Sequence, residues 1–479
     1  MWFRHRRAGV WFRPEEPGSN CPQRLDAWEG AEQSPSVNLL QLTPGAGAMY
    51  CGGCLRDNAL VAALRKLGHQ ALMVPLYLPL TLDEEDQSAG TPVFFGGINV
   101  YLQQKTALFR GAPGWLHDLF SSRRLLTWAA GKAAKTRPAD LGELTLSILR
   151  GEAGNQAREI EELIAWLKAQ PRTDVITLSN ALLIGMARRL KSELHVPVAC
   201  ALQGEDSFLD SLPESHRAAC WRTLAERAAE VDLFIAPSRY FGNLMRERLG
   251  LPANRVRVVY NGINLEGYAV EGQKPDGRWQ MANGKESGVS TLGFFARMCP
   301  EKGLDTLVEA YVLLRQRGRV GRLKLRVGGS CGPADAAFVD SLRERLRVSG
   351  LLGDVEFEPN LDRAGKLEFL RSLSVFSVPA RYGEAFGLYV IEAMAAGVPV
   401  VQPRTAAFPE LIEATGGGVL CTAGDVPVLA EAVEDMLLNS TRARALGEAG
   451  RRAVFQRFSA EAMARATLQV YAELVGKAA

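Results

Sequence analysis

Two glutamates stand eight positions apart in the segment ARYGEAFGLYVIEAMAAG, and both are placed unusually for charged residues. Glu384 lies in a polar loop, just after an apolar run that ends at Pro379. Glu392 lies among the apolar residues of VIEAMAA, where an unpaired charge is costly. A single glutamate at either place would be read as an ordinary solvated charge. Because a carboxylate accepts charge-assisted hydrogen bonds from hydroxyl groups, the pair favours a ligand that carries sugar and ribose hydroxyls.

The turn between the two glutamates favours an anion. The pattern predicts a helix that begins near Leu388 and stops at Gly397. The N–H groups of Phe386, Gly387 and Leu388 would then lie at the positive end of the helix dipole, with no acceptors inside the helix. Gly387 has no side chain that would hold a phosphate away. We therefore predict that this turn binds phosphate.

Two cations follow another apolar run, LGFFA. They are Arg297 and Lys302, in the segment ARMCPEKGLDTLVEA. Ligands of open α/β sheets bind at the carboxyl ends of the strands, so both cations should lie at the same sheet edge as Glu384. Cations fixed there can stabilise the charge that a diphosphate gains as it leaves, without help from a metal ion. The alternative is that both are solvated loop charges.

Two series of alternating strands and helices position these residues. The first covers residues 37–260 and opens with the strand VNLLQL, the loop TPGAGAMYCGG, a helix and the strand ALMVPLYL, which is one βαβ unit. An insertion at 81–155 interrupts it. The second covers residues 261–456. The predicted fold class is α/β, with two Rossmann-like, doubly wound domains. Residues 1–36 show no period and predict a disordered extension, while 457–479 predict a final helix.

The composition describes an ordinary globular protein. The 479 residues are 47% apolar and 23% charged, and the net charge of +3 argues against nucleic acid as a partner. Eight scattered cysteines suggest no disulfide framework, which favours a reducing compartment. No apolar run reaches the roughly 18 residues of a membrane span, and the basic start lacks a signal-peptide core. We expect a cytoplasmic protein.

On these motifs the sequence resembles the retaining GT-B glycosyltransferases of family 4. The family's E-x7-E motif stands here as EAFGLYVIE, followed by AMAAGVPVV. The segment ARMCPEKGLDTLVEA is similar to the family's R-x4-K segment, and VYNGINLEGY is similar to its domain junction. The resemblance runs from about Val37 to the C-terminus and is strongest between Tyr260 and Pro403.

The resemblance implies an enzyme that moves a sugar from a nucleotide diphosphate sugar to a hydroxyl acceptor, with retention of configuration and without a cofactor or metal ion. It implies two domains facing across a cleft, with the donor on the C-terminal side and the final helix packed on the first domain. Arg297 and Lys302 would hold the diphosphate, Glu384 the transferred sugar and Glu392 the ribose. The remaining donor-binding candidates are Gly45, Gly47, Asn360, Leu361, Phe386, Gly387 and Leu388.

The acceptor side departs from the family. Many members carry a histidine after the strand that corresponds to VPVACAL, where this sequence has LQGED. Gln203 can bond to a sugar hydroxyl but cannot act as a base. Glu205 and Asp206 either contact the acceptor or cap the next helix. The acceptor could be a sugar, a lipid-linked sugar or a small molecule.

Weaker signals leave alternatives open. The CGGC of Cys51 to Cys54 is either a thiol oxidoreductase motif or a run of small residues beside a ligand, and we favour the second. The acidic DEED, Asp83 to Asp86, lies in the insertion and forms no convincing metal motif. The basic segment 119–138 either contacts an anionic inner membrane face or covers the acceptor cleft. Rival functions are a GT-B sugar-nucleotide epimerase and a non-catalytic sugar-binding protein.

Overall fold

The computed structural model describes residues 36–45, 52–80, 82–95, 138–268 and 288–478. Val37 to the C-terminus forms one compact unit. Four sequence predictions fall wholly or almost wholly outside the described residues: the disordered extension at 1–36, Gly47, Cys51 and the basic segment 119–138. Within the described ranges, no helix is both long and apolar enough to cross a membrane.

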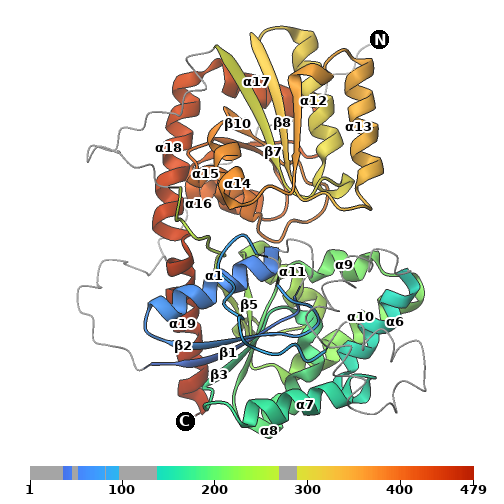
Figure 1. Ribbon diagram of the computed structural model, residues 1–479, viewed down its shortest axis with the longest axis vertical. Helices are drawn as coiled ribbons and strands as arrows, with labels where there is room; N and C mark the ends of the chain where they lie inside the picture. The colour runs from blue at the N-terminus through green and yellow to red at the C-terminus, as the bar shows by residue number, and fades with distance from the viewer. Residues whose placement is uncertain (1–35, 46–51, 81, 96–137, 269–287, 479) are drawn as a thin grey trace, which may run out of the picture. The chain divides into compact units, whose positions relative to one another are not determined.

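The first half of the chain forms a parallel sheet of six strands in the order β2-β1-β3-β4-β5-β6 (Figure 1). The chain adds β2 on one side of β1 and all later strands on the other, which is the doubly wound order. The strands are β1 (Asn38–Thr43), β2 (Gln70–Pro75), β3 (Val175–Leu178), β4 (Val198–Ala201), β5 (Leu233–Ala236) and β6 (Val256–Val258). The helices are α1 (Gly52–Lys66), α6 (Pro138–Arg150), α7 (Ala157–Lys168), α8 (Ala187–Leu194), α9 (Glu205–Ser211), α10 (Glu214–Arg227) and α11 (Arg239–Leu249).

Alternate residues of these strands pack on opposite faces of the sheet. Leu39 and Val175 join a core that includes α1 and the last helix of the chain, α19 (Ala460–Ala478). Their neighbours Leu40 and Ile176 join the core formed with α7, α8, α10 and α11. Because helices cover both faces, the strands are mainly apolar, and even the polar Gln41, Thr43 and Thr177 are buried.

The second half forms another parallel sheet, in the order β12-β11-β10-β7-β8-β9. The direction of strand addition reverses between β7 and β10, which are paired neighbours. Ligands of such sheets bind at the reversal point. The strands are β7 (Val289–Phe295), β8 (Arg322–Gly329), β9 (Val355–Pro359), β10 (Val375–Phe376), β11 (Val400–Pro403) and β12 (Gly418–Cys421). The helices are α12 (Leu304–Arg317), α13 (Ala336–Val348), α14 (Arg363–Arg371), α15 (Leu388–Ala395), α16 (Phe408–Thr415), α17 (Val426–Leu438) and α18 (Ser440–Arg457).

The predicted pair of doubly wound α/β domains is confirmed by these two sheets. Some details differ from the sequence pattern. The run VFSVPA forms only the two-residue strand β10, because Val378 and the residues after it leave the ladder toward the site loop. The insertion predicted at 81–155 contains helix α6, which packs its apolar side against η3 (Ala181–Met186) and α10. The stretch after Pro403 adds α16, β12, α17 and α18, none of which the motifs indicated.

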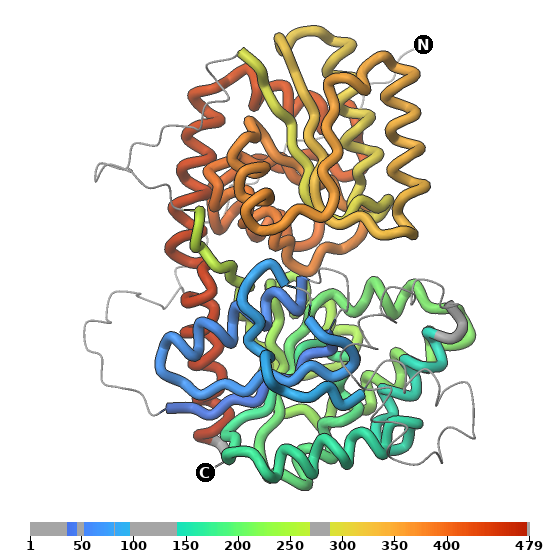
Figure 2. The backbone as a smooth tube through the Cα atoms, viewed as in Figure 1, coloured from blue at the N-terminus to red at the C-terminus, as the bar shows by residue number. Residues whose placement is uncertain are grey.

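The two segments that connect the halves of the chain, one after β6 and one before α19, lie against each other. After β6, Ile263 forms an isolated bridge with Ser459, which lies between α18 and α19. The N–H of Ile263 donates to the Phe458 carbonyl at 2.9 Å, and the N–H of Ala460 donates to the Ile263 carbonyl at 2.8 Å. Figure 2 follows the final red segment back to α1, in agreement with the shared core of α1 and α19.

Gly262 is required at this crossing. A Cβ atom there would lie 2.1 Å from the Ser459 carbonyl oxygen, so backbone would have to move. We expect Gly262→Ala to lower the free energy of unfolding by about 1–3 kcal/mol, as overpacking does. Thermal or urea unfolding measures the change. Gly321→Ala is the control, because nothing lies within 4 Å of the Cβ it would add. Equal stability of both variants would contradict a close crossing.

Candidate active site

Glu384 and Lys302 form an ion pair at the reversal point of the second sheet. Lys302 ends a short 3-10 turn, η6 (Pro300–Lys302), just after β7, and Glu384 lies in the loop between β10 and α15. Their Nζ and Oε2 atoms are 2.6 Å apart, and both side chains are largely buried. The hydroxyls of Tyr382 and Tyr389 donate to the same Oε2 at 2.9 and 2.7 Å. The Oε1 atom of Glu384 has no hydrogen-bond partner in the described part of the chain.

These partners keep Glu384 ionised. Burial by itself would raise the pKa of its carboxyl group, but the ammonium of Lys302 and the two tyrosine hydroxyls outweigh that effect and lower the pKa. Lys302 also lies over the rings of Tyr382 and Tyr389, at 4.8 and 5.0 Å from their centroids. A cation held by a carboxylate and two aromatic faces has little freedom to turn away. The loop thus presents one fixed carboxylate and one fixed ammonium.

Arg297 presents a second cation on the other side of β7. Its Nε and one terminal nitrogen reach both oxygens of Asp335, at 2.9–3.2 Å. The Asp335 side chain is 8% exposed, whereas that of Arg297 is 56% exposed. The bidentate pair therefore orients the guanidinium and leaves much of it accessible. The hydrogen bonds to Asp335 also raise the pKa of Arg297, so it stays charged.

A cavity of about 150 Å³ gathers five of the eleven predicted donor residues. Its walls come from both halves of the chain, with α1 and the segment after β2 facing the strand ends of the second sheet. Tyr389 lines this cavity and also bonds to Glu384, so the pair with Lys302 stands directly beside it. The lining residues predicted from the sequence are Arg297, Asn360, Leu361, Leu388 and Glu392, and those not predicted are Gly52, Leu55, Asp83, Phe295, Ala296, Gly329, Ser330, Lys366 and Tyr389.

Helix α15 begins where the sequence predicted. Gly387 precedes it with φ +94°, a backbone conformation that favours glycine. The N–H groups of Phe386, Gly387 and Leu388 have no acceptor among the described residues, so they remain available for a ligand. The Phe386 side chain itself is buried. At the base of the cavity Asn360 adopts φ +58° and exchanges two hydrogen bonds with the backbone of Cys331.

Residues of the first half of the chain bond to the loop that carries Glu384. Ser238, the cap of α11, donates its hydroxyl to the carbonyl of Ala385 at 2.7 Å. Glu410 of α16 accepts the N–H groups of Arg239 and Tyr240, at 2.9 and 3.2 Å, and so caps the same helix from the other half. The position of α11 is therefore tied to the loop that carries Glu384.

The acceptor-side candidates divide into two kinds. Glu205 is buried, and its carboxylate accepts the backbone N–H groups of Ala181, Gln203 and Gly204 at 2.7–3.0 Å. It fixes two loops ahead of α9 and does not cap that helix, whose start has no side-chain cap, so the capping alternative does not hold for Glu205. In contrast, Oδ1 of Asp206 and Nε2 of Gln203 are buried without a hydrogen-bond partner. A ligand hydroxyl or a water molecule can satisfy such atoms.

These two atoms belong to the neighbourhood of Glu384. A Cβ at Gly204 would lie 3.7 Å from the Cβ of Ala385. Burial raises the pKa of Tyr382, and the charges of Glu384 and Asp206 raise it further, which places Asp206 within electrostatic reach of the pair. Burial also raises the pKa of Asp206 itself.

The glycine loop is described only at its start. Gly45 has φ +77°, and a Cβ there would lie 1.7 Å from the Leu78 carbonyl oxygen, so glycine is required by the packing of the loop itself. Cys54 is buried on α1. Among the described residues, no group of three or more His, Cys, Asp or Glu side chains is placed to hold a metal ion.

Several site residues were not predicted from the sequence. Tyr382 lies two residues before Glu384 and Tyr389 lies inside the E-x7-E motif, so proximity to Glu384 was the available signal. Asp335 and Lys366 gave no such signal, because their partners lie 38 and 26 residues away. Asp83 was noted only as part of an acidic run in the insertion.

Family models match parts of both halves of the chain. A model of the group 1 glycosyl transferases matches residues 277–453, and a model of glycosyltransferase family 4 matches residues 143–266. The lipopolysaccharide core biosynthesis mannosyltransferase LpsB of Rhizobium meliloti is 30% identical over 46% of this chain and 61% of its own. The D-inositol 3-phosphate glycosyltransferase of Streptomyces coelicolor is 29% identical over 53% and 55%. The chain thus spans less than two thirds of each of these relatives.

Solved structures resemble the chain over nearly its whole length. HepE of Anabaena in complex with UDP matches with a TM-score of 0.62 at 15% identity, covering 92% of this chain and 100% of that one. Sucrose-phosphate synthase of Thermosynechococcus elongatus matches with a TM-score of 0.67 at 19% identity, with the same coverage. At such identities the likeness concerns the fold, and that fold is GT-B.

The lowered pKa of Glu384 has a consequence for stability. Its folded pKa lies below its unfolded value of about 4.3, so ionised Glu384 contributes stability that is complete above that value and disappears as the pH falls through the folded pKa. We expect Glu384→Gln to unfold at a lower temperature than the wild type at pH 7, with a difference that shrinks below about pH 4.

Thermal unfolding between pH 7 and pH 3 measures this difference. Glu461→Gln is the control, because Glu461 pairs with Arg465 on the surface of α19 and such pairs contribute little. A difference between the wild type and Glu384→Gln that stays constant to pH 3 would contradict the electrostatic account.

Proposed function

Because the chain belongs to the group 1 and family 4 glycosyltransferases of GT-B fold, we propose that it transfers a sugar from a nucleotide diphosphate sugar to a hydroxyl acceptor. We propose further that it does so with retention of anomeric configuration and without a metal ion. The observation that carries this proposal is the cavity that holds Arg297 and Glu392, with the start of α15 and the Lys302–Glu384 pair beside it.

The leaving diphosphate meets three sources of positive charge in this proposal. Arg297 is oriented by Asp335 and remains accessible. Lys302 stands beside the cavity, and Leu388, the first residue of α15, lines it, so the N–H groups at the start of this helix are the third source. Charge that develops on the phosphate is stabilised by donors that need no rearrangement at the moment of reaction. These groups can carry the charge that a metal ion carries in other transferases.

Glu384 holds the transferred sugar. Its Oε2 is occupied by Lys302 and the two tyrosines, while Oε1 is free to accept from sugar hydroxyls. Such charge-assisted bonds are worth roughly 1.5–3 kcal/mol. Glu392 accepts from the ribose hydroxyls, and Asn360 and Leu361 lie where the base enters.

In the proposed reaction step, the anomeric configuration is retained. The bond between the anomeric carbon and the phosphate oxygen breaks, and the acceptor oxygen forms its bond on the same face of the sugar. The acceptor proton passes to the departing phosphate oxygen, so no protein base is required for it. This removes the need for the family's histidine, which Gln203 replaces here.

Gln203 and Asp206 orient the acceptor. An acceptor hydroxyl can donate to Oδ1 of Asp206 and accept from Nε2 of Gln203, which satisfies both buried atoms. The related proteins favour a hexose donor: one is named as a mannosyltransferase, and solved neighbours are bound to UDP or UDP-glucose. UDP-glucose and GDP-mannose are therefore the first donors to test.

Loss of either member of the central pair should abolish most of the activity. We expect Glu384→Ala and Lys302→Ala to reduce turnover by a factor on the order of 10²–10³, as removal of a transition-state donor does. Sugar transfer is measured with the better of the two donors, in the presence of EDTA. The configuration of the product at the anomeric carbon is read by NMR.

Lys324→Ala is the matched control, because Lys324 lies on β8 and pairs with Glu356 away from the cavity. Its turnover should equal that of the wild type. Near-normal transfer by both pair variants would overturn the site assignment. Inhibition by EDTA would overturn metal independence, and an inverted product would overturn retention.

The acceptor assignment has its own test. We expect Asp206→Asn to lower kcat/KM for the acceptor about tenfold, since one charge-assisted hydrogen bond is lost, while the affinity for the nucleotide is unchanged. Asp210→Asn, four residues along α9, is the control, because Asp210 already bonds to Trp221 and Arg248. Equal effects of both variants would remove Asp206 from the acceptor site.

A further inference from the structure

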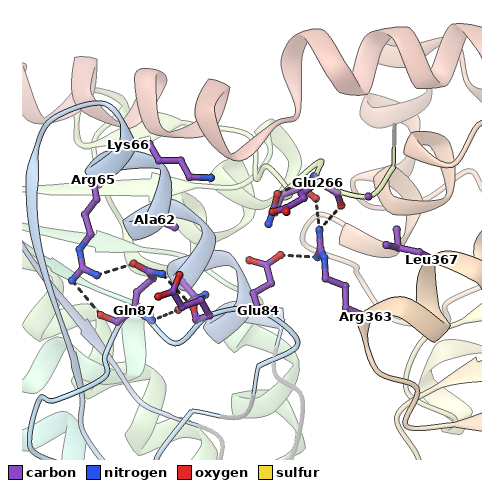
Figure 3. Close-up of a pocket in the computed structure, with 12 residues that line it drawn as sticks. Ala62, Arg65, Lys66, Glu84, Gln87, Glu266, Arg363 and Leu367 are labelled. Carbon is purple, nitrogen blue, oxygen red and sulfur yellow. Dashed lines mark hydrogen bonds and ion pairs between the residues drawn. The ribbon is translucent and has the colours of Figure 1, made fainter. Parts of the chain in front are cut away.

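Two acidic residues after β2 form ion pairs with two basic residues of α14. Asp83 Oδ2 lies 2.7 Å from Lys366 Nζ, and Glu84 Oε1 lies 2.8 Å from a terminal nitrogen of Arg363. Figure 3 shows the second pair. Each pair joins a residue of the first half of the chain to a residue of the second. The acidic residues are neighbours in sequence and the basic residues are three positions apart on α14, yet the two pairs differ in what else they contact.

Lys366 also binds Glu392. Its Nζ lies 3.1 Å from Glu392 Oε1, so one ammonium bridges a carboxylate of each half. The side chains of Asp83 and Lys366 are only 7% and 8% exposed. A lysine so deeply buried keeps its charge only with close partners. Burial works against that charge, but Glu392 and Asp83 outweigh it and raise the pKa of Lys366.

The bridge fixes one oxygen of Glu392 and leaves the other available. Oε1 is bound to Lys366, whereas Oε2 has no partner within the described ranges. Glu392, Lys366 and Asp83 all line the 150 Å³ cavity. A carboxylate on a helix surface can rotate freely, and a bridge of this kind selects one orientation. The free oxygen is then the one presented to a ligand.

We propose that Lys366 is a positioning residue for Glu392, and that Asp83, from the other half of the chain, holds Lys366 in that role. This inference rests on the proposed function, in which Glu392 binds the ribose of the donor. Without Asp83, the ammonium has Glu392 as its remaining carboxylate partner and pulls it away from the ribose. The ribose site is thus complete only while the segment after β2 contacts α14, which couples donor binding to contact between the halves.

The neighbouring pair provides a control within the chain. Arg363 donates to the carbonyls of Asn264 and Glu266 as well as to Glu84, and has no hydrogen bond or ion pair with Glu392. With Glu84 it lines a separate, larger cavity of about 580 Å³ (Figure 3). Asp83→Asn and Glu84→Gln therefore each remove one negative charge from adjacent positions, but only the first disturbs the bridge.

The direction in which each variant changes the nucleotide affinity distinguishes a positioning role from a general electrostatic effect. A lost negative charge near an anionic nucleotide strengthens its binding, and it does so at either position. Positioning predicts the opposite for Asp83→Asn alone, and only when the nucleotide carries ribose hydroxyls. Lys366→Met would leave two buried carboxylates without their cation and would unfold more easily, so Asp83→Asn is the primary variant.

The experiment is isothermal titration of the wild type, Asp83→Asn and Glu84→Gln with UDP and GDP, and with their 2′,3′-dideoxy forms. We expect the wild type to prefer the ribose form of its nucleotide by about tenfold or more, the worth of a charge-assisted hydrogen bond. Asp83→Asn should lose most of that preference through weaker binding of the ribose form. Glu84→Gln should keep it. Thermal unfolding confirms that each variant is folded.

The remaining outcomes count against specific claims. Loss of the preference in both variants, or in neither, overturns the positioning role of the bridge. Equal binding of the ribose and dideoxy forms by the wild type also overturns the positioning role, because Glu392 would then not bind the ribose. The proposed transfer function would still be supported in that case if Glu384→Ala shows the expected loss of turnover. Failure of both UDP and GDP to bind counts against the proposed function itself.

Discussion

The cost of burying charge is the constraint on which the arrangement of this site depends. Glu384, Asp335 and Lys366 are largely buried, and each has an opposite charge within 3.2 Å. A buried charge that loses its partner destabilises the fold strongly, so the partners are as fixed as the charges themselves. The site therefore needs no ligand to be organised: its carboxylates and cations already stand at defined positions at the edge of the second sheet.

The same constraint ties the two halves of the chain together at the places where function needs them in register. Ser238 reaches the Ala385 carbonyl beside Glu384, and Glu410 caps α11 from the other half. Asp83 reaches Lys366 beside Glu392. The contacts of Ser238 and Asp83 each end next to a residue proposed to bind the donor, and Glu410 holds the helix that carries the Ser238 cap. The two halves are thus connected through polar contacts at the candidate site, in addition to the shared core under α19.

The acceptor side carries the one departure from the family pattern that the sequence comparison of motifs identified, Gln203. A histidine at the position of Gln203 could exchange a proton, whereas an amide can only donate and accept hydrogen bonds. In the proposed reaction the departing phosphate takes the proton, so Gln203 and Asp206 need only bind the acceptor hydroxyl.

The sequence alone determined both doubly wound sheets, the start of α15 at Leu388 and the placement of Arg297 and Glu384 at strand ends. Strand ends, helix starts and glycine turns depend on residues a few positions apart, so a linear pattern records them. Only the tertiary structure decided the partners of the charges. Lys302 and Glu384 are 82 residues apart, and Asp83 and Lys366 are 283 apart. No local pattern links such residues, because they meet only when strand ends from distant parts of the chain converge and burial requires each charge to find its opposite.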